Sequence, residues 1–329
     1  MKTRKLGQNG PTVGVVGYGA MSFTDFYGPA SDEGSRGVLD ACLELGVTHL
    51  DTSNVYGMGR SETVIGDWLK RRGGDCPFTI ATKGGITRNA ERRFNNDRKH
   101  LEDALDSSLT RLGVEAVDLY YIHRRDPSIE IEEVTETLAG FVKAGKIKAI
   151  GFSEIAPSSL RRAHAVHPVA AVQSEYSLST RLPEMGMVQA CAEIGASLVA
   201  FSPVGRGLLT DRPHQASDVA EMGFLKVNPR FIEPNLSANL AINARFRAFA
   251  AEIGVPAATL AIAWLVSRGE HVLPIPGTRH VAHLEQVAAG GALDLDAETL
   301  ARIEEILPVG WAHGDRYSAG QWVGPEKYC

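Results

Sequence analysis

Short apolar runs alternate with longer amphipathic segments along most of the 329-residue chain. The runs are rich in Val, Ile and Leu, as strands buried on both faces of a parallel sheet are. They lie at residues 13–19, 47–51, 78–83, 117–123, 147–152, 170–175, 197–201 and 272–275. Between them, apolar residues recur three or four positions apart, which predicts helices packed by one face.

The predicted helices span residues 31–45, 61–70, 97–112, 130–144, 157–165, 183–194, 237–253, 256–267, 281–289 and 296–306. Ser31 is the expected N-cap of the first. Ahead of the first strand, Gln8-Asn9-Gly10 predicts the turn of a β-hairpin. Residues 202–237 interrupt the alternation, and residues 307–329 are rich in Gly and aromatic residues, which is typical of a loop.

Strand and helix alternate with a spacing of roughly 30 residues, which predicts a parallel sheet. Eight such units predict a closed (β/α)8 TIM barrel, preceded by the hairpin and followed by a C-terminal tail over the barrel mouth. A doubly wound open sheet is the alternative. Because no linker divides the sequence, we expect residues 1–329 to form a single domain.

The formal net charge of −5 argues against a nucleic-acid binder with a basic face. The densest basic cluster, residues 88–99, also contains acidic residues and is expected to be a solvated loop. No apolar run reaches the roughly 18 residues of a membrane span, and the N-terminal residues lack a signal peptide's apolar core. The four cysteines have no metal-binding spacing. We therefore expect a cytoplasmic protein with reduced thiols and no metal.

A (β/α)8 barrel carries its active site at the carboxyl ends of its strands. Three neighbouring predicted strands end in chemically capable residues: Asp51 with Tyr56 in the loop that follows, Lys83, and His123. Each residue alone has an ordinary structural explanation, such as a cap or a packed side chain. Four at adjacent strand ends are harder to explain as packing, since a buried Lys without a partner is costly.

These four side chains suit proton transfer to a carbonyl oxygen. Asp51 would hold the Lys83 ammonium, and Lys83 would lower the pKa of Tyr56. Tyr56 could then donate its proton to the oxygen, while His123 hydrogen-bonds the same atom. A carbonyl that gains a proton at oxygen also needs a reaction at carbon, for which hydride transfer from a nicotinamide is the natural partner.

The sequence resembles the aldo-keto reductases over nearly its whole length. The resemblance rests on the hairpin and on the motifs LDTSNVYGMGRSE, TIATKGG, DLYYIHR, IKAIGFSE, VQSEYS, FSPVGRGLLT and IPGTRHVAHLEQ, in that order. It implies a (β/α)8 barrel without a Rossmann domain, and NADPH-dependent reduction of an aldehyde or ketone. It also implies that Asp51, Tyr56, Lys83 and His123 form the catalytic tetrad, with Tyr56 as the proton donor.

The same resemblance implies where NADPH lies. Ser153 and Gln173 would bind the carboxamide, and Phe201 would lie against the nicotinamide ring. The pyrophosphate would be wrapped by Ser202, Pro203, Gly205, Arg206, Gly207 and Leu208. Gly277, Thr278 and Arg279 would lie by the 2′-phosphate, and Gln286 near the adenine. The chain departs from the usual family residues at Glu154, His283 and the pair Gln286-Val287, so the preference for NADPH depends mainly on Arg279.

Three competing interpretations remain open at this point. Gly17-Tyr18-Gly19 invites a Rossmann reading, but Ser22 occupies the place of the third glycine. We interpret these glycines as backbone clearance beside a ligand. His49, Asp51 and His123 could serve a metal-dependent barrel hydrolase. A non-catalytic, cofactor-binding regulatory subunit is the third possibility.

The loops would choose the substrate, which we expect to be a small-molecule carbonyl compound, with neither nucleic acid nor membrane as partner. Eight aromatic residues in these loops and the tail are candidates for an apolar pocket: Phe23, Phe26, Tyr27, Phe94, Phe224, Phe231, Trp311 and Trp322. They suggest a bulky aldehyde or ketone.

Overall fold

Eight parallel strands close into a barrel in the computed structural model, which describes residues 1–87, 89 and 91–328. The strands are β3 (Tyr18–Gly19), β4 (His49–Asp51), β5 (Thr79–Gly84), β6 (Leu119–Ile122), β7 (Ile150–Ser153), β8 (Val169–Glu175), β9 (Ser197–Phe201) and β10 (Val272–Pro274), paired in this order. The Gly17 amide donates to the Pro274 carbonyl at 2.9 Å and the Gly19 amide to Pro276 at 3.0 Å. These bonds join the first strand to the last, so the barrel prediction is confirmed and the open sheet is excluded.

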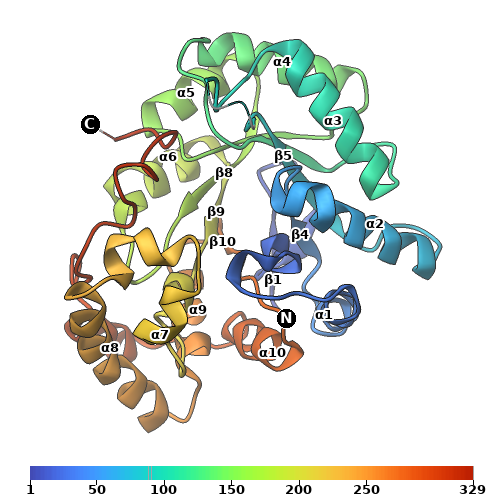
Figure 1. Cartoon of the computed structure of the whole chain (residues 1–329). Helices are drawn as coiled ribbons and strands as arrows, with labels where there is room; N and C mark the ends of the chain where they lie inside the picture. The colour runs from blue at the N-terminus through green and yellow to red at the C-terminus, as the bar shows by residue number, and fades with distance from the viewer. Residues whose placement is uncertain (88, 90, 329) are drawn as a thin grey trace.

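Helices surround the strands (Figure 1). They are α1 (Asp32–Glu44), α2 (Arg60–Arg72), α3 (Arg98–Leu112), α4 (Ile131–Lys143), α5 (Pro157–Val166), α6 (Met187–Ile194), α7 (Ala216–Ala220), α8 (Asn235–Glu252), α9 (Ala257–Val266), α10 (Val281–Gly290) and α11 (Ala297–Ile306). Ser31 caps α1 as expected, its hydroxyl accepting from the Gly34 amide at 3.1 Å.

Two predicted elements are divided in the structure. The run 13–19 contributes to two sheets, because β2 (Thr12–Gly14) pairs antiparallel with β1 (Thr3–Lys5), whereas β3 pairs with β4. The predicted helix 183–194 begins instead as a 3₁₀ turn at Leu182–Met185. Gly186, with φ of 126°, separates this turn from α6, since a left-handed residue cannot continue a helix.

The hairpin of β1 and β2 covers the amino-terminal end of the barrel. Leu6 and Val13 are buried and pack with the inward-facing residues of the strands, namely Ala81, Leu119, Tyr121, Ala171, Val199, Leu273 and Ile275. A separate and larger apolar core lies between the strands and the surrounding helices. The hairpin therefore fills the end of the barrel opposite the carboxyl ends of the strands.

The irregular segments lie around the other end. Residues 202–237 contain α7 and three 3₁₀ turns at Gly205–Gly207, Leu225–Val227 and Pro229–Phe231. From residue 307 to 328 the tail has no helix or strand, as predicted. Trp311 Nε1 donates to the Leu178 carbonyl at 2.8 Å, and the Glu326 carboxylate accepts from the Ala156 amide at 2.8 Å. These bonds hold the tail against the loops that follow β7 and β8.

The smaller predictions have mixed outcomes. Arg92 lies in the loop before α3 and pairs with Asp97 at the end of that loop and with Asp126 in the loop after β6. This agrees with a solvated loop. Cys42, Cys76 and Cys191 are free thiols. Arg88 of the basic cluster and the Cys329 thiol lie outside the described residues. Within the described chain, no single helix is long and apolar enough to cross a membrane; α8 and α9 meet that test only as a pair bent by 90°.

Truncation of Leu6 tests the packing of the hairpin against the barrel. Leu6→Ala removes buried methyl groups and leaves a void, so it should lower the free energy of unfolding by about 2–5 kcal/mol. Denaturant titration followed by circular dichroism measures the change. Thr12→Ala, at an exposed position of the same hairpin, should change it by less than about 0.5 kcal/mol. Equal small effects of both substitutions would contradict this packing.

Candidate active site

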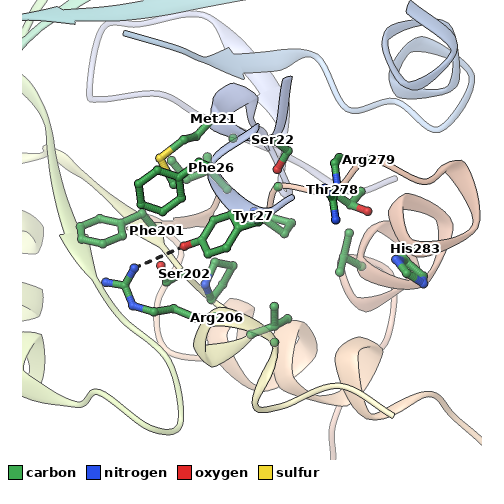
Figure 2. A pocket seen from close by; sticks show the side chains of 18 of the residues that line it. Met21, Ser22, Phe26, Tyr27, Phe201, Ser202, Arg206, Thr278, Arg279 and His283 are labelled. Atoms are coloured by element: carbon green, nitrogen blue, oxygen red, sulfur yellow. Dashed lines mark hydrogen bonds between the residues drawn. The ribbon is translucent and has the colours of Figure 1, made fainter. Parts of the chain in front are cut away.

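A cavity of about 790 Å³ opens at the carboxyl ends of the barrel strands. Its walls come from the loop between β3 and α1, from the ends of β4, β6, β7, β8 and β9, and from the segment that leads from β10 into α10. Figure 2 shows Tyr27 near the middle, between Phe201 and Arg206 on one side and Thr278 and Arg279 on the other. Residues far apart in sequence therefore share one cavity, as expected for this barrel class.

A buried chain of polar contacts links Asp51, Lys83 and Tyr56. The Lys83 ammonium donates to Asp51 Oδ1, to the Thr52 carbonyl at 2.8 Å and to the Tyr56 hydroxyl at 3.4 Å. The side chains of Lys83 and Asp51 are almost fully buried, at 0% and 2% exposure. The three acceptors match the three donors of an ammonium group, so the buried cation is fully hydrogen-bonded.

The pKa shifts along this series of polar contacts agree with the prediction for Lys83 but not with the prediction for Tyr56. Burial lowers the pKa of Lys83, but Asp51 and Tyr56 raise it by more, so the ammonium stays charged. The pKa of Tyr56 is raised, not lowered as predicted, because the effect of burial exceeds the opposing effect of Lys83. Tyr56 therefore keeps its proton at neutral pH. A protonated phenol is the state that can act as an acid.

His123 lies beside Tyr56, with ring centroids 5.8 Å apart and planes at 84°. Its Nδ1 is 3.1 Å from the Ser53 hydroxyl. Burial, with smaller effects from Arg124 and Lys83, lowers its pKa well below the usual range. The imidazole is thus neutral at pH 7, and the contact at Nδ1 leaves Nε2 as the ring nitrogen available to the cavity. The four residues of the predicted tetrad are brought together.

Most residues predicted to bind the cofactor also line this cavity: Ser153, Gln173, Phe201, Ser202, Pro203, Arg206, Gly207, Gly277, Thr278, Arg279 and Gln286. Gly205 and Leu208 do not line it. Leu208 is buried, with 1% exposure, and a Cβ at Gly205 would lie 2.9 Å from Ser179. Both residues are packed against the protein, and their contact with the pyrophosphate stays a prediction.

Three of these lining residues already have protein partners. Gln173 Nε2 donates to Asp51 Oδ2 at 2.7 Å, and the Ser153 hydroxyl accepts from Arg124 at 3.1 Å. Arg206 donates to Glu175 at 2.7 Å and to the Tyr27 hydroxyl at 3.4 Å. The positive charge of Arg206, which we expected to be available to a pyrophosphate, is therefore neutralised by a buried carboxylate.

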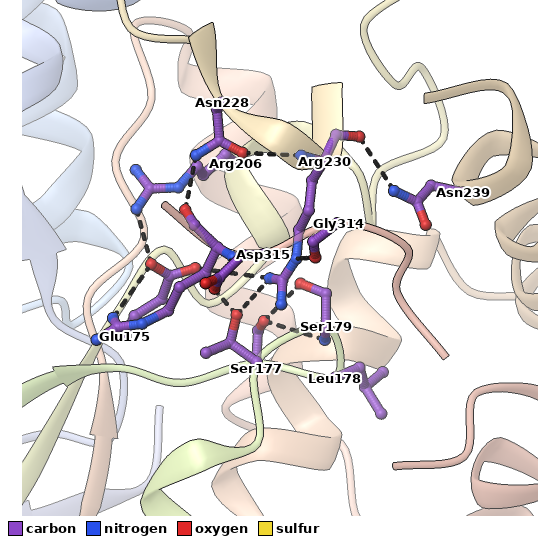
Figure 3. Close-up of polar contacts among 12 residues, drawn as sticks. Glu175, Ser177, Leu178, Ser179, Arg206, Asn228, Arg230, Asn239, Gly314 and Asp315 are labelled. Atoms are coloured by element: carbon purple, nitrogen blue, oxygen red, sulfur yellow. Dashed lines mark hydrogen bonds and ion pairs between the residues drawn. The ribbon is translucent and has the colours of Figure 1, made fainter. Parts of the chain in front are cut away.

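Glu175 is the centre of a charge cluster that the sequence did not predict. Figure 3 shows Arg206 and Arg230, both from the segment that follows β9, converging on it. Arg316 of the tail lies 3.6 Å and Arg230 3.9 Å from the Glu175 carboxylate. Burial would raise the pKa of Glu175, but the three arginines outweigh burial and hold the pKa below its usual range. The cluster joins β8, the segment after β9 and the tail.

Glu154 faces this cluster rather than the cavity. Its carboxylate pairs with Arg316 and accepts a hydrogen bond from the Glu175 backbone amide at 2.8 Å. Its own backbone adopts a φ of 57°. The departure from the usual family residue at position 154 thus serves to hold the tail. The sequence did show a charged residue, Glu154, directly after Ser153. It could not show the partner, because Arg316 lies 162 residues further along the chain.

The end of the cavity near α10 suits phosphate groups. Arg279, Arg212 and His283 line it, and residues at the start of α10 form part of its wall. Arg279 donates to the Pro29 carbonyl at 3.0 Å, which leaves its charge unneutralised by that contact. A cationic guanidinium beside a helix amino terminus favours anions. The residues present therefore fit the phosphate end of a nicotinamide dinucleotide.

The predicted aromatic lining is only partly correct. Phe26, Tyr27 and Phe224 line the cavity, and Tyr317 of the tail, which was not predicted, lines it too. Phe23, Phe94, Phe231, Trp311 and Trp322 do not. The first four of these are buried within the fold, where apolar surface is removed from water without contacting a ligand.

Two competing interpretations lose their basis. His49 is buried behind the cavity with Nδ1 3.2 Å from the Thr79 carbonyl, as a strand residue would be. No group of three potential metal-ligating side chains occurs among the described residues, and the Lys83 ammonium is paired with Asp51. A Cβ at Gly17 would lie 3.0 Å from His49 and Ile275. Gly17 therefore gives clearance between strands, whereas Gly19 lines the cavity, which agrees with clearance beside a ligand.

Comparisons with known proteins agree with this architecture. Residues 15–308 match the aldo/keto reductase family. The chain is 38% identical to the aldo-keto reductase yakc [NADP(+)] of Schizosaccharomyces pombe, over 97% of this chain and 95% of that one. It is 37% identical to a probable aldo-keto reductase 1 of Glycine max, over 96% and 92%. Glycerol dehydrogenase AKR11B4 from Gluconobacter oxydans has a similar structure, with a TM-score of 0.81, 25% identity, and coverage of 93% of this chain and 94% of that one.

The lowered pKa of His123 predicts a pH dependence of stability. As pH falls below about 6.5, the pKa of an unperturbed His, the unfolded chain takes up a proton that folded His123 resists. The free energy of unfolding should then fall by up to about 1.4 kcal/mol per pH unit on account of this residue. Denaturant titrations between pH 7.5 and 5.5 measure the slope.

His123→Gln should have a shallower slope than the wild type over this range. His313→Gln, at an exposed position of the tail, serves as the control and should keep the wild-type slope. His49, which is also buried with a lowered pKa, contributes to the slope in every variant. Identical slopes for wild type and His123→Gln would contradict a His123 that is neutral in the folded protein.

Proposed function

Since this chain belongs to the aldo/keto reductase family of oxidoreductases, which interconvert carbonyl and alcohol groups, we propose that it reduces an aldehyde or ketone with NADPH. Tyr56 is the proton donor in this proposal. The observation that carries it is the buried Asp51–Lys83–Tyr56 chain, which meets neutral His123 at one end of the cavity. The names of relatives support the choice of cofactor, since the Schizosaccharomyces pombe protein is named with NADP(+).

In the proposed mechanism, the substrate carbonyl oxygen lies between the Tyr56 hydroxyl and His123 Nε2. When bound, the nicotinamide would supply the hydride that adds to the carbonyl carbon. His123 donates a hydrogen bond that stabilises the negative charge growing on oxygen. Tyr56 transfers its proton to that oxygen, and the nearby Lys83 ammonium stabilises the phenolate that remains. Asp51 keeps Lys83 charged and in position.

The cavity-lining residues predicted from the sequence would hold the cofactor. The side-chain nitrogen of Gln173 donates a hydrogen bond to Asp51. Its side-chain oxygen is therefore the atom that would accept a hydrogen bond from the carboxamide. The Ser153 hydroxyl would give up its hydrogen bond from Arg124 and bind the same carboxamide. Phe201 would cover the ring and residues 202–208 the pyrophosphate, while residues 277–279 and Gln286 would contact the adenosine end.

The remaining expectations stay part of this proposal. Residues 1–329 would act as one domain, in the cytoplasm, on a small-molecule carbonyl compound. A non-catalytic, cofactor-binding role is the alternative, and it requires neither a protonated Tyr56 nor a charged Lys83. Steady NADPH consumption with a panel of aldehydes and ketones would exclude it.

Removal of the Tyr56 hydroxyl tests the proton donor. Tyr56→Phe should lower kcat for carbonyl reduction by about 10²- to 10⁴-fold, because general acid catalysis contributes on that order. NADPH oxidation followed at 340 nm measures kcat, and NADPH fluorescence titration checks that the cofactor still binds. Tyr176→Phe removes a hydroxyl bonded to Glu184 outside the cavity and should retain kcat within about threefold. Full turnover by Tyr56→Phe would refute the mechanism.

Replacement of Arg279 tests the preference for the phosphorylated cofactor. Arg279→Met should lower kcat/KM for NADPH relative to NADH by about 10- to 100-fold, because a charge-assisted hydrogen bond to the 2′-phosphate is lost. Arg302→Met, on α11 away from the cavity, is the matched control and should leave the ratio unchanged. An unchanged ratio in Arg279→Met would show that other residues select the cofactor.

A further inference from the structure

Arg124 follows His123 directly at the carboxyl end of β6 and lines the cavity. Its Nη1 donates to the His123 carbonyl at 2.6 Å and to the Ser153 hydroxyl at 3.1 Å, so the guanidinium lies across the ends of β6 and β7. The positive charge is close enough to add to the burial that lowers the pKa of His123, and to oppose slightly the burial that raises the pKa of Tyr56. Arg124 thus adjoins the groups that would hold a substrate carbonyl.

The charge of Arg124 is not matched by a carboxylate. Within the described part of the chain, Arg124 forms no ion pair, although it is half-buried. The nearby acidic residues have other partners: Asp51 is bound to Lys83, and Glu154 to Arg316. A partly desolvated guanidinium that has donors left over favours an anionic oxygen from a ligand.

The other arginines of the cavity lie elsewhere. Arg206 and Arg212 follow β9, and Arg279 follows β10. Arg206 is neutralised by Glu175, and the remaining two lie toward the end of the cavity that suits phosphates. The charge at the Tyr56 end is therefore separate from the charges that a dinucleotide's phosphates would engage.

Aromatic rings form another part of the cavity wall, where the ring centroids of Phe224 and Tyr317 lie 4.7 and 5.5 Å from the guanidinium carbon of Arg206. The ring centroid of Phe224 lies 6.3 Å from that of Tyr317 and 5.4 Å from that of Phe26, and all three side chains line the cavity. Burial raises the pKa of Tyr317, and Arg124 is near enough to oppose that rise slightly. Such a surface suits an apolar body, while the guanidinium suits one oxyanion attached to it.

We propose that Arg124 binds a carboxylate of the substrate, so that the preferred substrates are apolar carbonyl compounds that carry an acidic group. This inference rests on the proposed reductase function and specifies its substrate class. Arg124 acts as a specificity-determining residue: its free N–H groups donate hydrogen bonds to the substrate carboxylate, while Tyr56 and His123 hold the carbonyl. Its bond to Ser153 gives way when that hydroxyl turns to the carboxamide.

A pair of aldehydes that differ only in charge tests the inference. We expect the wild type to have a higher kcat/KM for 4-carboxybenzaldehyde than for its neutral methyl ester. Arg124→Met should lower the acid-to-ester ratio of kcat/KM by about 10- to 100-fold, mainly through the KM of the acid, because a charge-assisted hydrogen bond is lost. Arg124→Lys should restore part of the ratio, since it keeps the charge but not the bidentate geometry.

Arg161→Met is the matched control, because Arg161 pairs with Glu193 on the outer surface and does not line the cavity. It should keep the wild-type ratio, which excludes an effect of net charge alone. An equal ratio in wild type and Arg124→Met would overturn the inference. Equal losses of kcat for acid and ester would also overturn it, since they indicate a general role in catalysis.

A binding measurement separates this inference from the proposed function. Calorimetric titration of 4-carboxybenzaldehyde into the NADP⁺-loaded protein reports recognition without turnover. If wild type reduces neither aldehyde, the proposed function fails. Weaker binding to Arg124→Met than to wild type would then still support the inference, and equal binding would refute it.

Discussion

The buried ion pair between Lys83 and Asp51 is the constraint on which the rest of the site depends. Each ion loses hydration worth several kcal/mol on burial, and the mutual attraction offsets this only when the remaining hydrogen bonds are made. Lys83 satisfies that condition through Thr52 and Tyr56, and Asp51 through Gln173. The pair therefore fixes groups on β4, β5 and β8 together, and it positions the Tyr56 hydroxyl through the contact with Lys83.

Local sequence patterns were sufficient to predict the barrel and the cluster of candidate catalytic residues at its strand ends. Apolar runs and amphipathic helices each depend on a few consecutive residues, and the (β/α)8 topology then places Asp51, Lys83 and His123 at neighbouring strand ends. The sign of the Tyr56 pKa shift was not predictable in this way. It depends on the balance between burial and the Lys83 charge, and burial is known only once the surrounding residues are placed.

The charge cluster around Glu175 also lay beyond prediction, for a different reason. Its arginines come from positions 206, 230 and 316, in segments without regular periodicity. No spacing rule connects them, because loops are positioned by side-chain contacts that the chain makes only after folding. The same limit applies to Phe23 and Phe231, whose aromatic character alone does not tell a core position from a cavity wall.

Closure of the barrel has a consequence for biosynthesis. The bond from Gly17 to Pro274 joins the first strand to the last, so the first strand lacks one neighbour until the ribosome has made the chain as far as Pro274. Until then the nascent chain exposes an unpaired parallel edge, of the kind that associates with other chains. Such an intermediate would suit chaperones that bind nascent chains, and slow synthesis between β9 and β10 would prolong its exposure.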